Sequence, residues 1–360
     1  MGNMFDFDPK TYASGFANDG YVHIAEGLTP HFYMALKKYV DELLGSKQMK
    51  DFAGGDKLQA VYEFLQPAHY DELRETVAAI CGVDAKSLVL AERHIKAYAA
   101  DANPHPMAHK DRFGSEVSVG FSIDVPEGST LVLYPEHDAV ANPFNSTAEL
   151  RSSFCPHTAP ETGLKNARRV EIRDKPRDMM IFKGSATWHL RERAAGTTVL
   201  YLKLNTYNCD TLGEDKHNAD TRQRTLDLLY SSDATLFASI PMIARKVDYV
   251  HRRYNRDWRE VLGVVIFGGP HLSINETEFG ILQAMDGQRT VADIAKRIDQ
   301  TGNGIGFEEI IRCLAERGVI DLLPHRVVRG EATLGPIDRS AAVGGTQPEA
   351  QVPMVNAAID

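Results

Sequence analysis

The sequence NPHPMAHKD at residues 103–111, followed by the alternating segment VSVGFSI at residues 117–123, says most about the fold of this chain. Successive side chains of a strand point to opposite faces, so the alternating segment predicts a β-strand. A proline-rich loop precedes it, and residues two apart near a strand end face the same side. We therefore expect His109 and Asp111 to lie side by side at one edge of a β structure.

Other short segments of strand character follow one another from about residue 88, separated by Gly, Pro and Asn. Many short strands with turn signals between them are typical of a β-sandwich or barrel, so we predict a mainly β fold with flanking helices. The helices are expected at 29–44, with Thr29 as N-cap, and across most of 57–82. The long polar segment 135–167 is expected to be a lid or binding loop. The predicted strands are 21–24, 88–99, 116–125, 130–134, 168–173, 178–183 and 197–205.

The composition excludes some classes of protein. The chain has 360 residues, 43% of them hydrophobic and 25% charged, as in an ordinary globular protein. This length suggests two domains, or one large domain with an appendage. Its formal net charge of −9 provides no general attraction for nucleic acid or anionic membranes. No apolar stretch approaches the roughly 18 residues of a membrane span, and the acidic N-terminus does not resemble a signal peptide. The four cysteines are far apart, so a cytoplasmic location is expected.

Two histidines and one carboxylate are the candidate metal ligands. His109 and Asp111 are one residue apart, and His189 follows a predicted strand and turn at 178–184. Two imidazoles and one carboxylate form the facial triad that holds non-haem Fe(II) and leaves positions open for substrate chemistry. The sequence therefore predicts that His109, Asp111 and His189 bind one iron ion and form the catalytic centre.

A second His-x-Asp sequence at residues 69–71 shows that the tripeptide alone is a weak signal. It leads into a helical pattern through residues 78–80. Asp71 and Glu72 then lie near the positive end of the helix dipole, so we interpret this copy as the start of a helix.

Several segments resemble the phytanoyl-CoA dioxygenase-like family, over roughly residues 15–207. The resemblance implies a double-stranded β-helix (jelly roll), Fe(II) held by His109, Asp111 and His189, and 2-oxoglutarate and O2 as co-substrates. The segments that carry it are GYVHI at 20–24, LTP at 28–30, HKD at 109–111, GSTLVLYP at 128–135 and residues 178–189.

One position departs from the family pattern. The family usually has an arginine about eleven residues after the distal histidine, which binds the far carboxylate of 2-oxoglutarate, but here that position is Leu200. Lys203, on the same predicted strand, is our first candidate for this role, because a lysine can neutralise a carboxylate without the arginine fork. Arg193 in the preceding turn is the competitor. Lys96 is a further candidate for contact with the co-substrate. An exposed surface position remains the alternative for Lys203 and for Lys96.

The C-terminal part is expected to be a separate winged-helix-like module at residues 261–325, after an oxygenase domain at 1–260 and before a disordered tail at 326–360. Segments 272–277 and 286–291 resemble PqqD-like domains, which implies recognition of a peptide or carrier-bound substrate. A structural cap or a dimerisation module is the alternative. The predicted helices are 276–285, 291–298 and 307–317, and the predicted strands are 264–267 and 319–323.

Residues 216–260 are expected to contain two or three helices. Within them, the basic and aromatic stretch 245–259 is interpreted as a solvated helix packed against the barrel, with a partner-binding face as the alternative.

Taken together, the sequence predicts an Fe(II)- and 2-oxoglutarate-dependent dioxygenase that hydroxylates or desaturates a C–H bond of a biosynthetic small molecule, amino acid or peptide. One alternative is a winged-helix regulator that binds nucleic acid or peptide beside a catalytically silent barrel. The net charge argues against nucleic acid, as does segment 307–317, whose only basic residues are Arg312 and Arg317. A metal-free binding scaffold is the third possibility. The oligomeric state and the substrate stay open.

Overall fold

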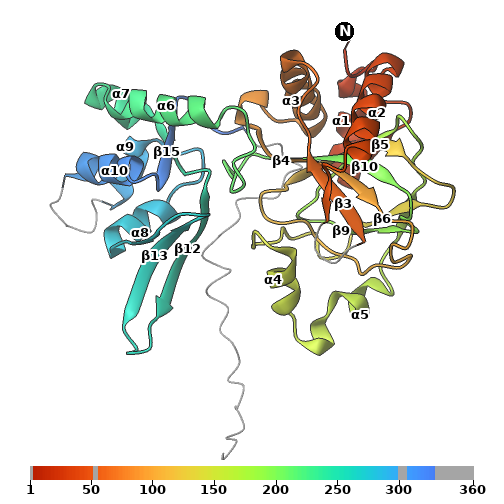
Figure 1. The fold of residues 1–360 in the computed structure, drawn as a ribbon. Coiled ribbons are helices and arrows are strands. Elements are labelled where there is room, and N and C mark those ends of the chain that lie inside the picture. Colours follow the sequence, from red (N-terminus) through yellow and green to blue (C-terminus); the bar gives the residue numbers. More distant parts are fainter. Residues whose placement is uncertain (1–2, 52–55, 299–305, 329–360) are drawn as a thin grey trace, which may run out of the picture.

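The computed structural model describes residues 3–51, 56–298 and 306–328, which form two lobes (Figure 1). The first lobe holds a seven-stranded antiparallel sheet in the order β1-β8-β5-β10-β4-β3-β2 and a three-stranded antiparallel sheet in the order β7-β6-β9. The strands are β1 (Tyr21–Ile24), β2 (Lys50–Asp51), β3 (Lys57–Val61), β4 (Val89–Tyr98), β5 (Val117–Asp124), β6 (Thr130–Tyr134), β7 (Val170–Ile172), β8 (Met179–Phe182), β9 (Trp188–Glu192) and β10 (Thr198–Asn205).

The small sheet packs against one face of the large sheet. Leu131 and Leu133 on β6 and Ile172 on β7 form one buried cluster with Met180 and Phe182 on β8. Two antiparallel sheets packed in this way, with few consecutive strands adjacent, make a jelly roll. The prediction of a mainly β jelly roll with flanking helices is therefore confirmed.

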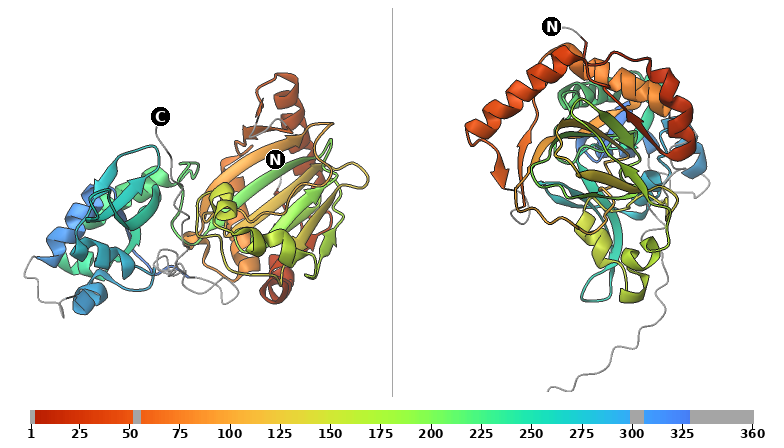
Figure 2. Two further views of the ribbon diagram at one scale, coloured as in Figure 1. Left: turned by 90° about the horizontal axis from the view of Figure 1, so that it is seen from below. Right: turned by 90° about the vertical axis from the view of Figure 1, so that its right-hand side faces the viewer.

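The opposite face of the large sheet is covered by helices α1 (Ala13–Asp19), α2 (Pro30–Gly45) and α3 (Pro67–Cys81) (Figure 2). Helix α2 begins as predicted, because the Thr29 hydroxyl accepts a hydrogen bond from the Phe32 N–H and Pro30 occupies the first turn. Helix α3 ends at Gly82, whose φ of 69° is a conformation that favours glycine.

The prediction that residues 57–82 are mainly helical is wrong in its first part. Residues 57–61 form β3, which pairs with the long strand β4 in the register Lys57↔Tyr98 to Val61↔His94. The helix begins only at Pro67. Strand propensity depends strongly on the neighbouring strand, and here pairing with a distant strand decides the conformation of a short segment.

The segment 135–167 is a long connection that contains two short helices, α4 (Thr147–Ser152) and α5 (Pro160–Leu164). Leu150 and Leu164 from these helices form a buried cluster with Trp188, which is 2% exposed. Trp188 therefore packs against both short helices. The connection is thus held against strand β9, one residue from the candidate ligand His189.

The second lobe is built from helices and short strands around its own hydrophobic core. Three of its helices and its last strand were predicted within two residues of their ends. The elements are α6 (Asn218–Leu229), α7 (Asp233–Ala238), β11 (Ile240–Ile243), β12 (Val247–Tyr254), β13 (Glu260–Ile266), β14 (His271–Ser273), α8 (Glu276–Gln283), α9 (Val291–Ile298), α10 (Phe307–Glu316) and β15 (Ile320–Leu323).

The core of this lobe includes residues from well before position 261. Leu229 and Leu236 pack with Ile281 and Leu314, and β11 pairs with β15. The predicted boundary at residue 260 falls at the first residue of β13, which pairs with β12, so by packing the second lobe begins before it, with α6. Residues 329–360, most of the predicted tail, lie outside the described residues. Val327 is described and is 2% exposed.

The interpretation of residues 245–259 as a helix is wrong. Most of this stretch is strand β12, and residues 255–259 form the turn to β13. The Asn255 side chain accepts hydrogen bonds from the N–H groups of Asp257 and Arg259, at 2.9 and 3.0 Å, which shapes the turn. Trp258 lies at this turn and is 83% exposed. The outer half of this hairpin is exposed, from Arg252 to Tyr254 on β12, which explains why the stretch is rich in charge without a helical period.

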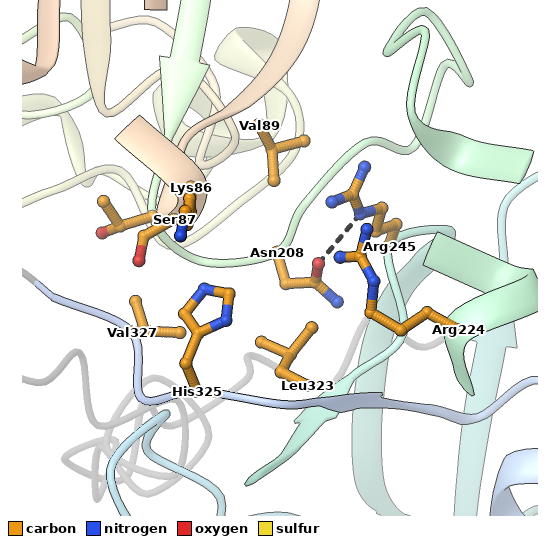
Figure 3. Close-up of a pocket in the computed structure, with 10 residues that line it drawn as sticks. Lys86, Ser87, Val89, Asn208, Arg224, Arg245, Leu323, His325 and Val327 are labelled. Atoms are coloured by element: carbon orange, nitrogen blue, oxygen red, sulfur yellow. Dashed lines mark hydrogen bonds between the residues drawn. The ribbon is translucent and has the colours of Figure 1, made fainter. Parts of the chain in front are cut away.

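The two lobes meet around residues 206–215 and strand β15. Asn208 donates to the Asp321 carboxylate at 2.8 Å, and the backbone N–H of Val328 donates to the Ser87 hydroxyl at 3.1 Å. Figure 3 shows a small pocket at this junction, where Arg245 donates to the Asn208 side-chain oxygen at 2.9 Å. Side chains of both lobes line the pocket: Lys86, Ser87, Val89, Thr206, Asn208, Arg224, Arg245, Leu323, His325 and Val327.

Within the part of the chain that the structure describes, no helix combines the length and the apolar character needed to cross a membrane.

Candidate metal centre

The three predicted ligands come together at one end of the jelly roll. His109 and His189 face each other as an isolated antiparallel bridge, with reciprocal N–H···O=C hydrogen bonds of 2.9 and 2.8 Å. Their ring centroids are 4.4 Å apart. The loop that precedes β5 is thus pinned to strand β9 by its backbone, and this pairing brings together two histidines that are 80 positions apart in the sequence.

The Asp111 side chain is oriented by a second backbone contact. The Asp111 N–H donates to the Gly184 carbonyl at 3.0 Å, in the turn between β8 and β9. A Cβ atom on Gly184 would lie 1.9 Å from the Ser118 hydroxyl and 2.7 Å from Asp111 Oδ2. Only glycine leaves room for the carboxylate here.

The two carboxylate oxygens of Asp111 have different partners. Oδ2 accepts hydrogen bonds from the Ser118 hydroxyl at 2.6 Å and from the Lys203 ammonium. Oδ1 lies 3.7 Å from His189 Nε2. One oxygen is therefore held by the protein, and the other faces the histidines.

The His189 ring is oriented by its own strand turn. Its Nδ1 lies 2.9 Å from the Thr187 carbonyl oxygen. A carbonyl can only accept, so Nδ1 carries the proton and Nε2 keeps a free lone pair. A backbone acceptor on the far nitrogen is the usual arrangement around a metal-binding histidine.

The environment keeps the three groups in the protonation states that metal binding requires. Burial lowers the pKa of His109 well below its ordinary value, and the nearby His189 ring adds to this effect. Burial also lowers the pKa of His189. Burial alone would raise the pKa of Asp111, but the Lys203 ammonium and the two imidazoles outweigh it and hold that pKa below its ordinary value. Neutral imidazoles and an ionised carboxylate are the forms that coordinate a cation.

One nitrogen of each imidazole and one oxygen of Asp111 all lie within 4.8 Å of one another. In the described part of the chain this is the one cluster of three or more such residues close enough to share an ion. Two imidazoles and one carboxylate suit Fe(II) in the facial arrangement that leaves other coordination positions open. The residues present therefore fit the predicted metal.

Basic residues line the interior of the jelly roll next to the candidate ligands. Lys96 on β4 points inward, pairs with Glu92 at 3.2 Å, and lies 5.4 Å from the centre of the Tyr201 ring. Lys203 is 3% exposed and contacts Asp111. Lys203 is therefore not an exposed strand residue, and Lys96 is not a surface lysine.

Arg193, the other predicted contact of 2-oxoglutarate, lies elsewhere. It is exposed at the turn after β9, has a φ of 49°, and donates from Nε to the Gly128 carbonyl at 2.8 Å. The inward arginine is Arg191, two residues after His189 on the same face of β9. Its guanidinium binds both oxygens of Asp174 at 2.9 Å. Sequence reasoning missed Arg191, although its spacing of two from His189 was a usable signal.

The second His-x-Asp sequence lies near the start of α3, as expected, although Asp71 falls just after the first turn. His69 is 2% exposed and its ring packs edge-on against Phe32 at a centroid distance of 5.1 Å. This histidine is a core residue of the helical layer.

No protein-family model matches the sequence, and no curated protein matches it either. Among solved structures, the chain is similar to the non-haem α-ketoglutarate-dependent carbocyclase SnoK of nogalamycin biosynthesis, with 15% identity, a TM-score of 0.44, and coverage of 57% of this chain and 87% of that one. It is also similar to a Pseudomonas putida prolyl-4-hydroxylase, with 12% identity, a TM-score of 0.36, and coverage of 55% and 97%. A third similar structure is EvdO2 of Micromonospora carbonacea var. aurantiaca, complexed with 2-oxoglutarate. Its identity to this chain is 13% and its TM-score is 0.40, with coverage of 57% of this chain and 92% of that one. The jelly roll described above is established by strand order and packing, and the resemblances to phytanoyl-CoA dioxygenase-like and PqqD-like proteins stay predictions.

Proposed function

We propose that the protein is an Fe(II)- and 2-oxoglutarate-dependent oxygenase, with His109, Asp111 and His189 as the iron ligands. The observation that carries this proposal is the meeting of two imidazoles and one carboxylate oxygen inside a jelly roll, within 4.8 Å of one another. Backbone hydrogen bonds fix the position of all three residues: His109 and His189 bond to each other, and the Asp111 N–H donates to the Gly184 carbonyl.

We further propose that Lys96 binds the far carboxylate of 2-oxoglutarate. Of the three basic residues predicted for the co-substrate, Arg193 lies in an exposed turn and Lys203 is hydrogen-bonded to Asp111. Lys96 points into the same interior as the candidate ligands, beside Tyr201, and its ion pair is with Glu92 and not with a metal ligand. An ammonium group neutralises a carboxylate as a point charge.

When bound, iron and 2-oxoglutarate supply the oxidant for a C–H bond, and for hydroxylation the balance is R–H + O2 + 2-oxoglutarate → R–OH + succinate + CO2. The chain itself binds and orients the reactants and excludes water. Trp188, the neighbour of His189 on β9, packs against Leu150 of α4 and Leu164 of α5 and so holds the long connection against this strand. Excluding water from such a site prevents side reactions.

The substrate is proposed to be a small molecule, amino acid or peptide with an accessible C–H bond, and hydroxylation or desaturation is the proposed outcome. The second lobe is proposed to recognise a peptide or a carrier-bound substrate. The support for this is β14, which lies at the edge of the sheet β12-β13-β14 and can accept an added strand.

The test is succinate formation from 2-oxoglutarate by the anaerobically purified full chain, supplied with Fe(II) and then with air. We expect His109→Ala and Asp111→Ala to form no succinate above the rate without protein. His105→Ala, in the same loop but exposed, is the matched control and keeps the wild-type rate. Ligand variants that turn over like the wild type would remove the triad from the proposal.

The role of Lys96 has its own test. Lys96→Met is expected to raise the KM for 2-oxoglutarate at least tenfold, whereas Arg193→Met leaves it unchanged. The opposite pattern would assign the far carboxylate to Arg193.

A further inference from the structure

Lys203 is placed to act on the metal ligand Asp111. In the sheet register Lys203 on β10 lies directly opposite Ser118 on β5, so both side chains point into the jelly roll from neighbouring strands. The lysine ammonium donates to Asp111 Oδ2 and lies 3.0 Å from the Ser118 hydroxyl, which donates to the same oxygen at 2.6 Å. The three side chains form a closed triangle of hydrogen bonds.

This triangle of side chains lies in the interior of the jelly roll. Lys203 is 3% exposed and Ser118 is fully buried. Gly184 lies against both Ser118 and Asp111 Oδ2, where the Cβ atom of any larger residue would overlap them. Since one oxygen of Asp111 is enclosed by two donors and a glycine turn, only Oδ1 faces His189.

The number of oxygens that Asp111 offers matters for the proposed reaction. A carboxylate can bind a cation through one oxygen or through both. A facial triad leaves three positions open, and a co-substrate that chelates through two atoms needs two of them. If Asp111 used both oxygens, it would take one of these positions.

We propose that Lys203, together with Ser118, reserves Oδ2 of Asp111, so that this ligand binds the metal through Oδ1 alone and the co-substrate finds two free positions. The inference rests on the proposed function and extends it, because it makes Lys203 a positioning residue for the metal ligand and not a contact of 2-oxoglutarate. Ser118 shares this role from the neighbouring strand.

The experiment uses Co(II) as a probe of the metal-free, full-length protein and reads its visible absorption, first alone and then with 2-oxoglutarate. In Lys203→Met the second oxygen of Asp111 loses one of its two donors, and a buried cation next to the ion is lost. We expect Co(II) to bind several-fold more tightly than in the wild type, with a changed absorption spectrum. The affinity of the Co(II) form for 2-oxoglutarate should fall about tenfold.

Two variants accompany this measurement. Ser118→Ala removes one of the two donors with little change in volume, so it should shift the Co(II) spectrum in the same direction by a smaller amount. It keeps the test decisive if Lys203→Met does not fold. Lys96→Met is the matched comparison, because it removes another inward cation, on the adjacent strand, whose ion pair is with Glu92 at 3.2 Å. Both hydrogen bonds to Asp111 Oδ2 stay in place in this variant, so the Co(II) spectrum without 2-oxoglutarate should keep the wild-type shape while 2-oxoglutarate binding weakens.

Two results would overturn the inference. In the first, Lys203→Met and Ser118→Ala bind Co(II) with the wild-type affinity and spectrum. In the second, Lys203→Met weakens 2-oxoglutarate binding as Lys96→Met does and changes nothing else. If the wild-type protein binds Co(II) but its visible absorption does not change when 2-oxoglutarate is added, the proposed function itself is contradicted. A wild-type protein that binds no Co(II) contradicts both.

Discussion

The two faces of the seven-stranded sheet are built from the same strands but have opposite chemistry. On β10, Leu200, Leu202 and Leu204 point to the helices α1–α3 and are fully buried among apolar side chains. Between them, Tyr201 and Lys203 point into the jelly roll. One strand thus supplies both a hydrophobic core and part of a candidate catalytic site, because its side chains alternate.

This difference shows where stability and function reside in the first lobe. The helix-covered face gains from apolar burial, which is not directional. The inner face and the small sheet opposite it contain charged groups that must be paired to be tolerated. Lys203 on the large sheet pairs with Asp111, and Arg191 on the small sheet pairs with Asp174. We therefore expect variants inside the jelly roll and variants on the helix-covered face to differ in how far they lower the free energy of unfolding. They should also differ in whether they alter metal binding.

The largest effect is expected inside the jelly roll, at the ion pair between Arg191 and Asp174, whose side chains are 2% and 0% exposed. Asp174→Asn leaves a buried guanidinium without its counter-ion and should lower the free energy of unfolding by about 3–5 kcal/mol. Urea denaturation measures this loss.

The matched control for this pair is the double variant Arg191→Met with Asp174→Leu. Apolar residues of similar volume should recover most of the lost stability, since the buried charge is gone. A double variant as unstable as Asp174→Asn would show that the interior charges stabilise the fold beyond their mutual pairing.

A smaller effect is expected on the helix-covered face, at Leu202. Leu202→Ala removes a fully buried side chain and should cost about 3 kcal/mol of unfolding free energy. Its Co(II) affinity in the folded state should stay at the wild-type value, because the side chain points away from the ligands. Leu202→Met should cost less than about 1.5 kcal/mol. A loss of Co(II) affinity in Leu202→Ala would mean that the two faces are not independent.

The smallest effect is expected at His94, an inward residue of β4 whose ring nitrogens contact Glu92 at 3.2 Å and Glu214 at 2.6 Å. Burial alone would lower the pKa of His94, but the hydrogen bonds to Glu214 and Glu92 outweigh it and raise that pKa above its ordinary value of 6.5. A raised pKa in the folded state contributes stability that is fully present below pH 6.5 and is lost as the pH rises through the higher folded value.

Unfolding free energy should therefore decline from pH 6.5 upward in the wild type, and this part of the decline should vanish in His94→Gln. Denaturation curves at several pH values measure it. An identical pH profile for the two proteins would show that His94 does not couple to these carboxylates.

Much of the first lobe could be predicted from the sequence because its signals are local. Thr29 and Pro30 mark the start of α2, and period-two alternation marks β5 and β10. The residue types at His109, Asp111 and His189 were sufficient to name a metal site, which the structure assembles within 4.8 Å. By contrast, residues 57–61 and 247–254 were predicted as helix and form strands.

The sequence by itself determined which side chains are chemically able to bind a metal and which strands alternate, since the first depends on residue type and the second on local spacing. Only the tertiary structure decided which inward side chains meet. Lys203 and Asp111 are 92 positions apart, and their contact depends on the register of β10 against β5. Arg193 lies outside and Arg191 inside because they belong to a turn and to a strand face. A shift of one residue in register would reverse every such assignment, and register is set by pairing and packing between distant segments.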